Sequence, residues 1–128
     1  MAKTRYSQTS NVHPKRGEIY LTALDPTLGR EIQKTRPALV IQNDVSNRLT
    51  EITIVAPITS TVRFPLNPVQ VLLSADQTTG LAVVSVALLN QIRAVDQLRL
   101  IKKLGTVDEE ILTRVDEAIS ISLGLMKI

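Results

Sequence analysis

Short runs of Val, Ile and Leu, separated by residues that favour turns, dominate the chain between residues 18 and 96. Turn residues such as Asp25-Pro26, Asn43-Asp44 and Gly80 divide these runs. The runs predict five strands: EIYLTAL (18–24), PALVIQN (37–43), ITIVAPI (52–58), PVQVLLS (68–74) and LAVVSVALL (81–89). A sixth strand is expected over QIRAVD (91–96). Because the connections are too short for crossover helices, the strands are expected to pair antiparallel in a small barrel or curled sheet.

The hydrophobic period changes after residue 106. From Asp108 onward, apolar positions recur at steps of three and four, which predicts an amphipathic helix over about 107–123. Thr106 and Glu109 fit a capping box, and Gly124 can end the helix. The helix is expected to close the barrel or to pack on its face. Its apolar stripe consists of Ile111, Leu112, Val115, Ala118, Ile119 and Ser122.

Composition limits the organisation and the chemistry of the chain. Its 128 residues, 44% of them hydrophobic, can form one core, predicted as a single domain over 16–128 after a polar arm at 1–15. The absence of cysteine excludes disulfides, and a single histidine cannot build a zinc site or a two-histidine acid–base pair. The first residues lack an apolar signal run, and no run of about eighteen apolar residues occurs, which favours a cytoplasmic protein with no membrane contact.

The net charge of +3 comes from the N-terminal part of the chain. Residues 1–36 hold seven Lys or Arg against three Asp or Glu, whereas the rest is nearly balanced. So modest a surplus is weak evidence for a polyanionic partner. With no Trp, one Phe and two Tyr, the chain lacks the aromatic platforms on which single-stranded nucleic acids stack. RNA binding would therefore depend mainly on hydrogen bonds and charge.

Four polar clusters interrupt the predicted strands: DPTLGREIQKTR (25–36), QNDVSNR (42–48), APITST (56–61) and NQIR (90–93). Arg36 is conspicuous because Pro37 restricts the residue before it to extended geometry. A plainer role competes in the first three clusters: a solvated loop, Asn and Asp as turn formers, and hydroxyls that bond the backbone. Taken together, an arginine and neutral donors can stabilise phosphate charge, and the sequence has no Cys-His, Ser-His-Asp, HExxH or P-loop pattern.

Four segments closely resemble the MazF/PemK/Kid family of toxin endoribonucleases: RGEIYLTALDPTLGREIQKTRPALVIQND, TIVAPITS, LLNQIRAVDQLRL and VDEAISISLGL. The resemblance runs from about Arg16 to about Leu125. It implies an SH3-like antiparallel β-barrel of about five to seven strands with a C-terminal helix, acting as a homodimer. It also implies a type II toxin that cleaves single-stranded RNA without a metal or other cofactor. The implied partner is a MazE-like antitoxin whose disordered C-terminal segment occupies the RNA groove.

The resemblance also assigns roles to individual residues. The family's catalytic arginine falls on Arg36 and its catalytic threonine on Thr59. Asn90 stands where relatives commonly have the glutamate of LLEQIR, so their base preference does not carry over. Positions matching the active-site loop or the groove are Glu31, Asn43, Ser60 and Gln91. Further polar residues of the four clusters are predicted to contact substrate: Lys34, Thr35, Asn47, Thr61, Asn90 and Arg93.

RNA carries its own nucleophile, the 2′-OH, which explains how cleavage could proceed with these residue types alone. The resemblance implies products with a 2′,3′-cyclic phosphate and a 5′-OH. Two alternatives stay open: a CcdB-like toxin that poisons DNA gyrase with the same barrel, and a non-enzymatic SH3-like module that binds nucleic acid. The pairing of Arg36 with Thr59 favours the nuclease over the gyrase poison, and RNA binding without cleavage of any sequence would favour the non-enzymatic module.

Overall fold

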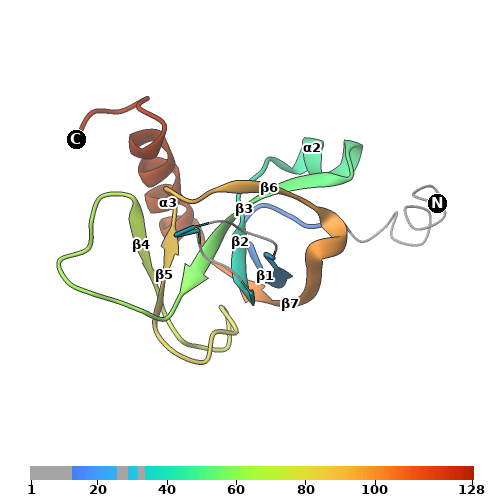
Figure 1. The fold of residues 1–128 in the computed structure, drawn as a ribbon, viewed down its shortest axis with the longest axis horizontal. Helices are drawn as coiled ribbons and strands as arrows, with labels where there is room; N and C mark the ends of the chain where they lie inside the picture. Colours follow the sequence, from blue (N-terminus) through green and yellow to red (C-terminus); the bar gives the residue numbers. More distant parts are fainter. Residues whose placement is uncertain (1–12, 26–28, 32–33) are drawn as a thin grey trace.

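The computed structural model describes residues 13–25, 29–31 and 34–128 of the chain, so most of the predicted 1–15 arm lies outside the described residues. Within them, seven strands form one antiparallel sheet that curls, and a C-terminal helix packs against it (Figure 1). The strands are β1 (Glu18–Ala23), β2 (Thr35–Val40), β3 (Ile52–Thr59), β4 (Gln70–Leu73), β5 (Ser85–Leu88), β6 (Arg93–Asp96) and β7 (Leu100–Thr106). The helices are α2 (Asp44–Leu49), the 3₁₀ turn η1 (Gln97–Arg99) and α3 (Glu109–Ser122).

The long strand β3 organises the sheet. The strand order is β4-β5-β3-β2-β1-β7, and β6 pairs with β3 outside this path. Along β3, residues 52–55 pair with β6 and residues 58–59 with β5, while residues 55–57 pair with β2. Among the described residues no ladder joins β4 to β7, so the predicted antiparallel sheet is confirmed but is not closed into a barrel by strand pairing.

Both faces of the central strands are buried, which explains their nearly unbroken hydrophobic runs. On one face, Leu39 of β2 and Ile58 of β3 share a core with Val115 of α3. On the other face, Ala38 of β2 and Val55 of β3 belong to a smaller core that also contains Leu24, Val40 and Val95. Successive strand residues point to opposite faces, so neighbouring residues along one strand enter different cores.

The helix α3 packs on the sheet, as the apolar stripe predicts, with Val115 and Ala118 buried. The predicted capping box is wrong at its first position, because Thr106 ends β7 and pairs with Glu18 of β1. Asp108 is the N-cap instead, since its Oδ1 accepts a hydrogen bond from the Ile111 amide at 2.9 Å. Gly124 ends the helix with φ of +76°, which confirms the predicted stop.

A polar cluster joins β1 to β7 beside the smaller core. The Tyr20 hydroxyl donates to Glu18 Oε1 at 3.1 Å, and Lys103 Nζ lies 2.9 Å from Glu18 Oε2. Burial, and then the neighbouring Glu18 carboxylate, raise the pKa of Tyr20 to about 12. Tyr20 therefore stays neutral at physiological pH. No helix among the described residues is long and apolar enough to cross a membrane.

Candidate active site

The β2–β3 ladder sets the relation between Arg36 and Thr59. Its paired residues run from Val40↔Val55 to Ala38↔Pro57. Continuing this register by two residues places Arg36 opposite Thr59, on the face of the sheet that carries Ala38 and Pro57. On its other side, Arg36 pairs with Thr22 of β1. Arg36 thus has Thr22 as its ladder partner on the β1 side, and on the β3 side it lies two residues beyond the last pair of the ladder, where alternation points to Thr59.

Both predicted catalytic side chains are half-buried. Arg36 is the second residue of β2, and Pro37 follows it within the strand, paired with Leu21 of β1. Thr59 is the last residue of β3, and its Oγ1 accepts a hydrogen bond from the Thr61 amide at 3.2 Å. The Thr59 oxygen therefore has the backbone role that competed with the catalytic one, while its hydrogen remains able to be donated to a ligand.

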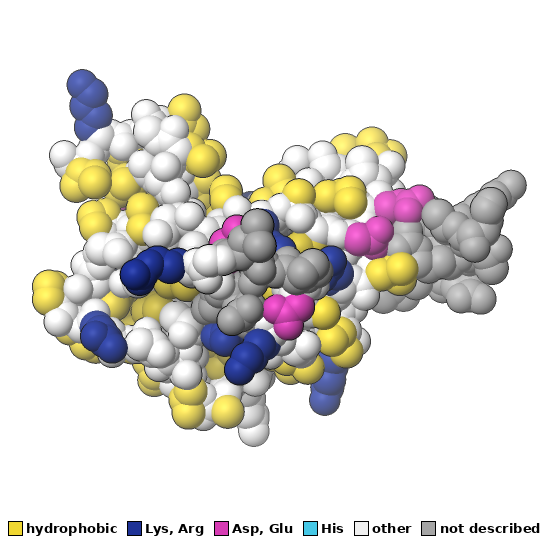
Figure 2. Space-filling view, viewed as in Figure 1, with side chains coloured by type: hydrophobic (Ala, Val, Ile, Leu, Met, Phe, Trp, Pro, Cys, Tyr) yellow, Lys and Arg dark blue, Asp and Glu magenta, His cyan; other side chains and the backbone are white. Residues whose placement is uncertain are grey.

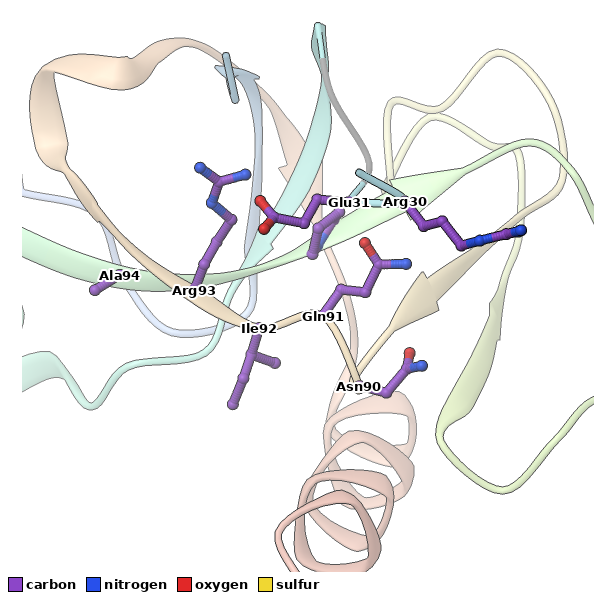
Figure 3. A pocket seen from close by; sticks show the side chains of 8 residues that line it. Arg30, Glu31, Asn90, Gln91, Ile92, Arg93 and Ala94 are labelled. Carbon is purple, nitrogen blue, oxygen red and sulfur yellow. The ribbon is translucent and has the colours of Figure 1, made fainter. Parts of the chain in front are cut away.

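A pocket of about 630 Å³ adjoins this face. Figure 3 shows the residues that line it, which come from the 29–31 segment and from the chain that leads into β6. Arg30 and Glu31 extend to opposite sides, and the Gln91 amide points towards them (Figure 3). Pro57 lies on the same face of β3 as Thr59, which connects the pocket to the Arg36–Thr59 pair. The complete lining is Arg30, Glu31, Pro57, Asn90, Gln91, Ile92, Arg93 and Ala94.

The pocket is polar and carries more positive than negative charge. Two arginines, Arg30 and Arg93, line it against one carboxylate, Glu31. Figure 2 shows Lys and Arg side chains across the middle of the face seen there. Asn90 and Gln91 add amide groups that can both donate and accept hydrogen bonds. Such a surface fits an anionic ligand that also offers polar edges, as a nucleic-acid strand does.

A family model described as the PemK-like, MazF-like toxin of type II toxin-antitoxin systems matches residues 15–123. The chain belongs to this toxin family. The toxin is 43% identical over 112 residues to Endoribonuclease EndoA of Bacillus subtilis, and the match covers 88% of this chain and 96% of EndoA. The predicted membership of the MazF/PemK family of toxin endoribonucleases is confirmed. Relatives of this kind favour the nuclease over the gyrase poison and the non-enzymatic module.

Solved structures agree with the fold of the toxin. A crystal structure of MazF from Deinococcus radiodurans superposes with a TM-score of 0.74 at 27% identity, and covers 88% of this chain and 97% of that one. A MazE–MazF crystal structure from the same organism has a TM-score of 0.67 at 26% identity, with the same coverage of both chains. The predicted MazF-like sheet with a C-terminal helix is therefore confirmed.

The fold brings together some predicted site residues of the toxin and separates others. Glu31, Asn90, Gln91 and Arg93 meet in one pocket, although about sixty residues separate the first from the rest. Ser60 and Thr61 follow Thr59 directly and are exposed. Lys34 and Thr35 precede Arg36 and are exposed as well.

Neither asparagine of the 42–48 cluster lines this pocket. Asn43 caps α2, since its Oδ1 accepts from the Ser46 amide at 2.8 Å, and it lines a second pocket beside α3. The predicted substrate contact of Asn47 is wrong, because this side chain is fully buried. Its Oδ1 accepts from Gln42 Nε2 at 2.9 Å and from Thr53 Oγ1 at 2.7 Å, which ties α2 to β3. The sequence could not separate the two asparagines, because both have turn-forming neighbours.

The sequence prediction missed four pocket residues of the toxin: Arg30, Pro57, Ile92 and Ala94. Arg30 had a signal, since it adjoins Glu31 in a cluster already singled out. The three apolar residues had none, because apolar residues in predicted strands are expected in the core. Among the described residues, no group of three or more His, Cys, Asp or Glu could hold a metal ion.

Proposed function

We propose that the toxin is a metal-independent endoribonuclease that cleaves single-stranded RNA at short sequences, with Arg36 and Thr59 at the reacting phosphate. The observation that supports the proposal is the β2–β3 ladder, whose register, continued two residues past its last pair, brings Arg36 to Thr59 on the face that adjoins a basic, amide-lined pocket. Family membership supports the reaction class, and the resemblance of the motifs around Arg36 and Thr59 supports these two residues.

In the proposed reaction the 2′-oxygen of RNA forms a bond to the adjacent phosphorus, and the bond from phosphorus to the 5′-oxygen breaks. The 2′-OH loses a proton and the 5′-oxygen gains one, which leaves a 2′,3′-cyclic phosphate and a 5′-OH. The Arg36 guanidinium can bind two non-bridging oxygens at once, and Thr59 can donate a further hydrogen bond. Because a guanidinium keeps its proton in proteins, Arg36 is a poor base and acts through charge.

Base selection is assigned to the pocket. Asn90 and Gln91 offer donors and acceptors to base edges, while Arg30 and Arg93 can contact phosphates. Unpaired bases present free Watson–Crick edges, whereas these edges are already paired within a duplex, which supports a single-stranded substrate. Because Asn90 replaces a glutamate common in relatives, the cleaved sequence is expected to differ from theirs.

The partners are proposed from family membership. The MazE–MazF structure from D. radiodurans supports a MazE-like antitoxin as the cognate partner, and we propose that it covers the same groove as RNA. The toxin is proposed to act in the cytoplasm as a homodimer. Sedimentation velocity at micromolar concentration should give the dimer mass, and a monomer there would contradict this part of the proposal.

The test is incubation of the purified toxin with mixed-sequence single-stranded RNA in EDTA, followed by mapping of the product ends. Wild type should cut at one short motif and leave 5′-OH ends. Arg36→Ala should lose more than a hundredfold in rate, because it removes a charged donor from the reacting phosphate. Arg114→Ala is the matched control, since it removes an arginine that is 62% exposed on α3.

Each alternative result has a definite meaning. If Arg36→Ala keeps more than about a tenth of wild-type cleavage, Arg36 is not the catalytic arginine. If the wild type cuts only after a divalent metal is added, the metal-independent mechanism is wrong. If the wild type binds RNA but cuts no sequence, the nuclease proposal itself is wrong.

A further inference from the structure

The segment that precedes Arg36 is held by contacts between the end of β1 and the start of β2. Asp25 Oδ1 accepts a hydrogen bond from the Lys34 amide at 2.8 Å, and the Leu24 amide donates to the Lys34 carbonyl at 3.2 Å. Both contacts come directly after the last β1–β2 ladder pair, Ala23↔Thr35. We call these two hydrogen bonds to Lys34 the clasp. Leu24 is fully buried, so this end of the clasp is anchored in the smaller core.

The backbone of Lys34 shows what the clasp does. Lys34 has φ of +72°, and no other non-glycine residue in the described part of the chain has a positive φ. Residues with a side chain rarely adopt this conformation, and they keep it only where their surroundings hold them in it. The Asp25 carboxylate and the Leu24 amide supply those contacts. Because Lys34 stands two residues before Arg36, its conformation sets the direction in which the chain begins β2.

Arg99, which lies just before β7, joins the same clasp to η1. Its Nη1 donates to the Ala23 carbonyl at 3.1 Å and also to the Asp25 carbonyl. Arg99 ends η1, which is itself fixed, since Gln97 Nε2 donates to the carbonyls of Asn47 at 2.9 Å and Thr50 at 3.1 Å. Through η1, the clasp is thereby connected to the corner between α2 and β3. Thr59 is the last residue of β3.

We propose that Asp25 and Arg99 are positioning residues that hold Arg36 in register with Thr59. Asp25 Oδ1 and Arg99 Nη1 both bond to backbone groups of the protein, so their proposed role is to hold the backbone and not to contact substrate. Asp25 fixes the Lys34 turn, and Arg99 ties that turn to the β3 side of the molecule. The inference rests on the proposed function of Arg36, because its consequence is a loss of catalytic rate.

The test compares Asp25→Ala and Arg99→Met with wild type in single-turnover cleavage at saturating RNA. Small misplacement of a catalytic group costs about ten- to a hundredfold, so each variant should lose about that much rate. Binding of an RNA strand with a single 2′-deoxy residue at the cleaved position should stay within about twofold. Asp25→Asn keeps an acceptor oxygen for the Lys34 amide and should stay close to wild type.

A double-mutant cycle with Arg36→Lys separates positioning from general stabilisation of the fold. If Asp25 acts through Arg36, then Asp25→Ala should cost much less in the Arg36→Lys background than in wild type. Losses that simply multiply would overturn the inference, and so would losses confined to RNA binding. Unchanged rates in folded Asp25→Ala and Arg99→Met, with thermal unfolding as the check, would overturn it as well.

Two further outcomes are distinguishable. If Asp25→Ala fails to fold, Arg99→Met and the milder Arg99→Lys decide, with hydrogen exchange of the Lys34 amide as the readout of the clasp. Faster exchange together with a slower reaction supports the inference, whereas faster exchange at an unchanged rate overturns it. A wild type that cleaves no RNA would refute the proposed function and this inference together, whereas failure of the variants alone refutes only the inference.

Discussion

At the scale of single residues, Thr59 has to perform two tasks with one hydroxyl. Its oxygen accepts the Thr61 amide, and in the proposed mechanism its hydrogen is donated to the reacting phosphate. Thr59→Val keeps the shape of the side chain and removes the hydroxyl, so cleavage should slow by about a hundredfold. Thr59→Ser keeps the hydroxyl and should stay within about tenfold of wild type. Single-turnover rates decide, and a valine variant as fast as the serine variant would remove Thr59 from the mechanism.

The chemistry of single residues could be predicted further than their surroundings. Arg36 could be singled out because Pro37 restricts its backbone, and this restriction depends only on the next residue in the sequence. Asn43 and Asn47 could not be told apart, because burial of one and exposure of the other depend on how α2 lies over β3. Residues whose role is set by their own neighbours in sequence are therefore predictable, whereas those set by contacts across the fold are not.

At the scale of elements, the segment after β4 contacts β7 and so links the two ends of the sheet, which no strand pairing joins among the described residues. The Thr106 amide at the end of β7 donates to the Thr78 carbonyl at 2.8 Å. The approach needs glycine, since a Cβ on Gly105 would lie 2.2 Å from the Thr78 carbonyl oxygen and one on Gly80 1.9 Å from that of Leu104. The contact joins the segment after β4 to β7, the two ends of the strand path.

Gly105→Ala should therefore lower the free energy of unfolding by about 1–3 kcal/mol or more, because backbone must move to admit the methyl group. Gly124→Ala is the matched control: its φ is +76° but no atom lies within 4 Å of the added Cβ, so it should cost only about 1 kcal/mol. Chemical denaturation measures both. Equal costs would mean that the contact between the segment after β4 and β7 contributes little to stability.

The elements that could be predicted from the sequence are those in which hydrophobic residues recur at a regular spacing. Six strands and α3 follow their hydrophobic patterns, and all seven are present. The strand β7 was missed because LIKKLGT has two adjacent exposed lysines, Lys102 and Lys103, and two register shifts against β1 interrupt its alternation. The short helix α2 was missed because its sequence, DVSNRL, follows Asn43 and is rich in turn formers. Its start is nevertheless local in origin, since Asn43 is its cap.

At the scale of the whole molecule, the curled sheet collects arginines from separate parts of the chain onto one side. Arg36 lies on the face that carries Pro57, and Arg30 and Arg93 line the adjoining pocket with Pro57. A charge count along the sequence places two of these arginines in the N-terminal surplus and the third in a nearly neutral region. The positive site is thus a product of folding, and the modest net charge of +3 understates it.

This gathering of charge predicts how salt affects RNA binding. Each phosphate neutralised on a single strand contributes about −0.7 to the slope of log K against log salt, so three arginine contacts should give a slope of about −2. The measurement uses a strand with a 2′-deoxy residue at the cleaved position, which binds without being cut. Arg30→Ala or Arg93→Ala should each reduce the slope by about 0.7, whereas Arg114→Ala should leave it unchanged. A slope near zero, or one that Arg114→Ala changes as much as Arg30→Ala, would show that the strand does not follow this pocket, because a phosphate releases its counterion only where a protein cation replaces it.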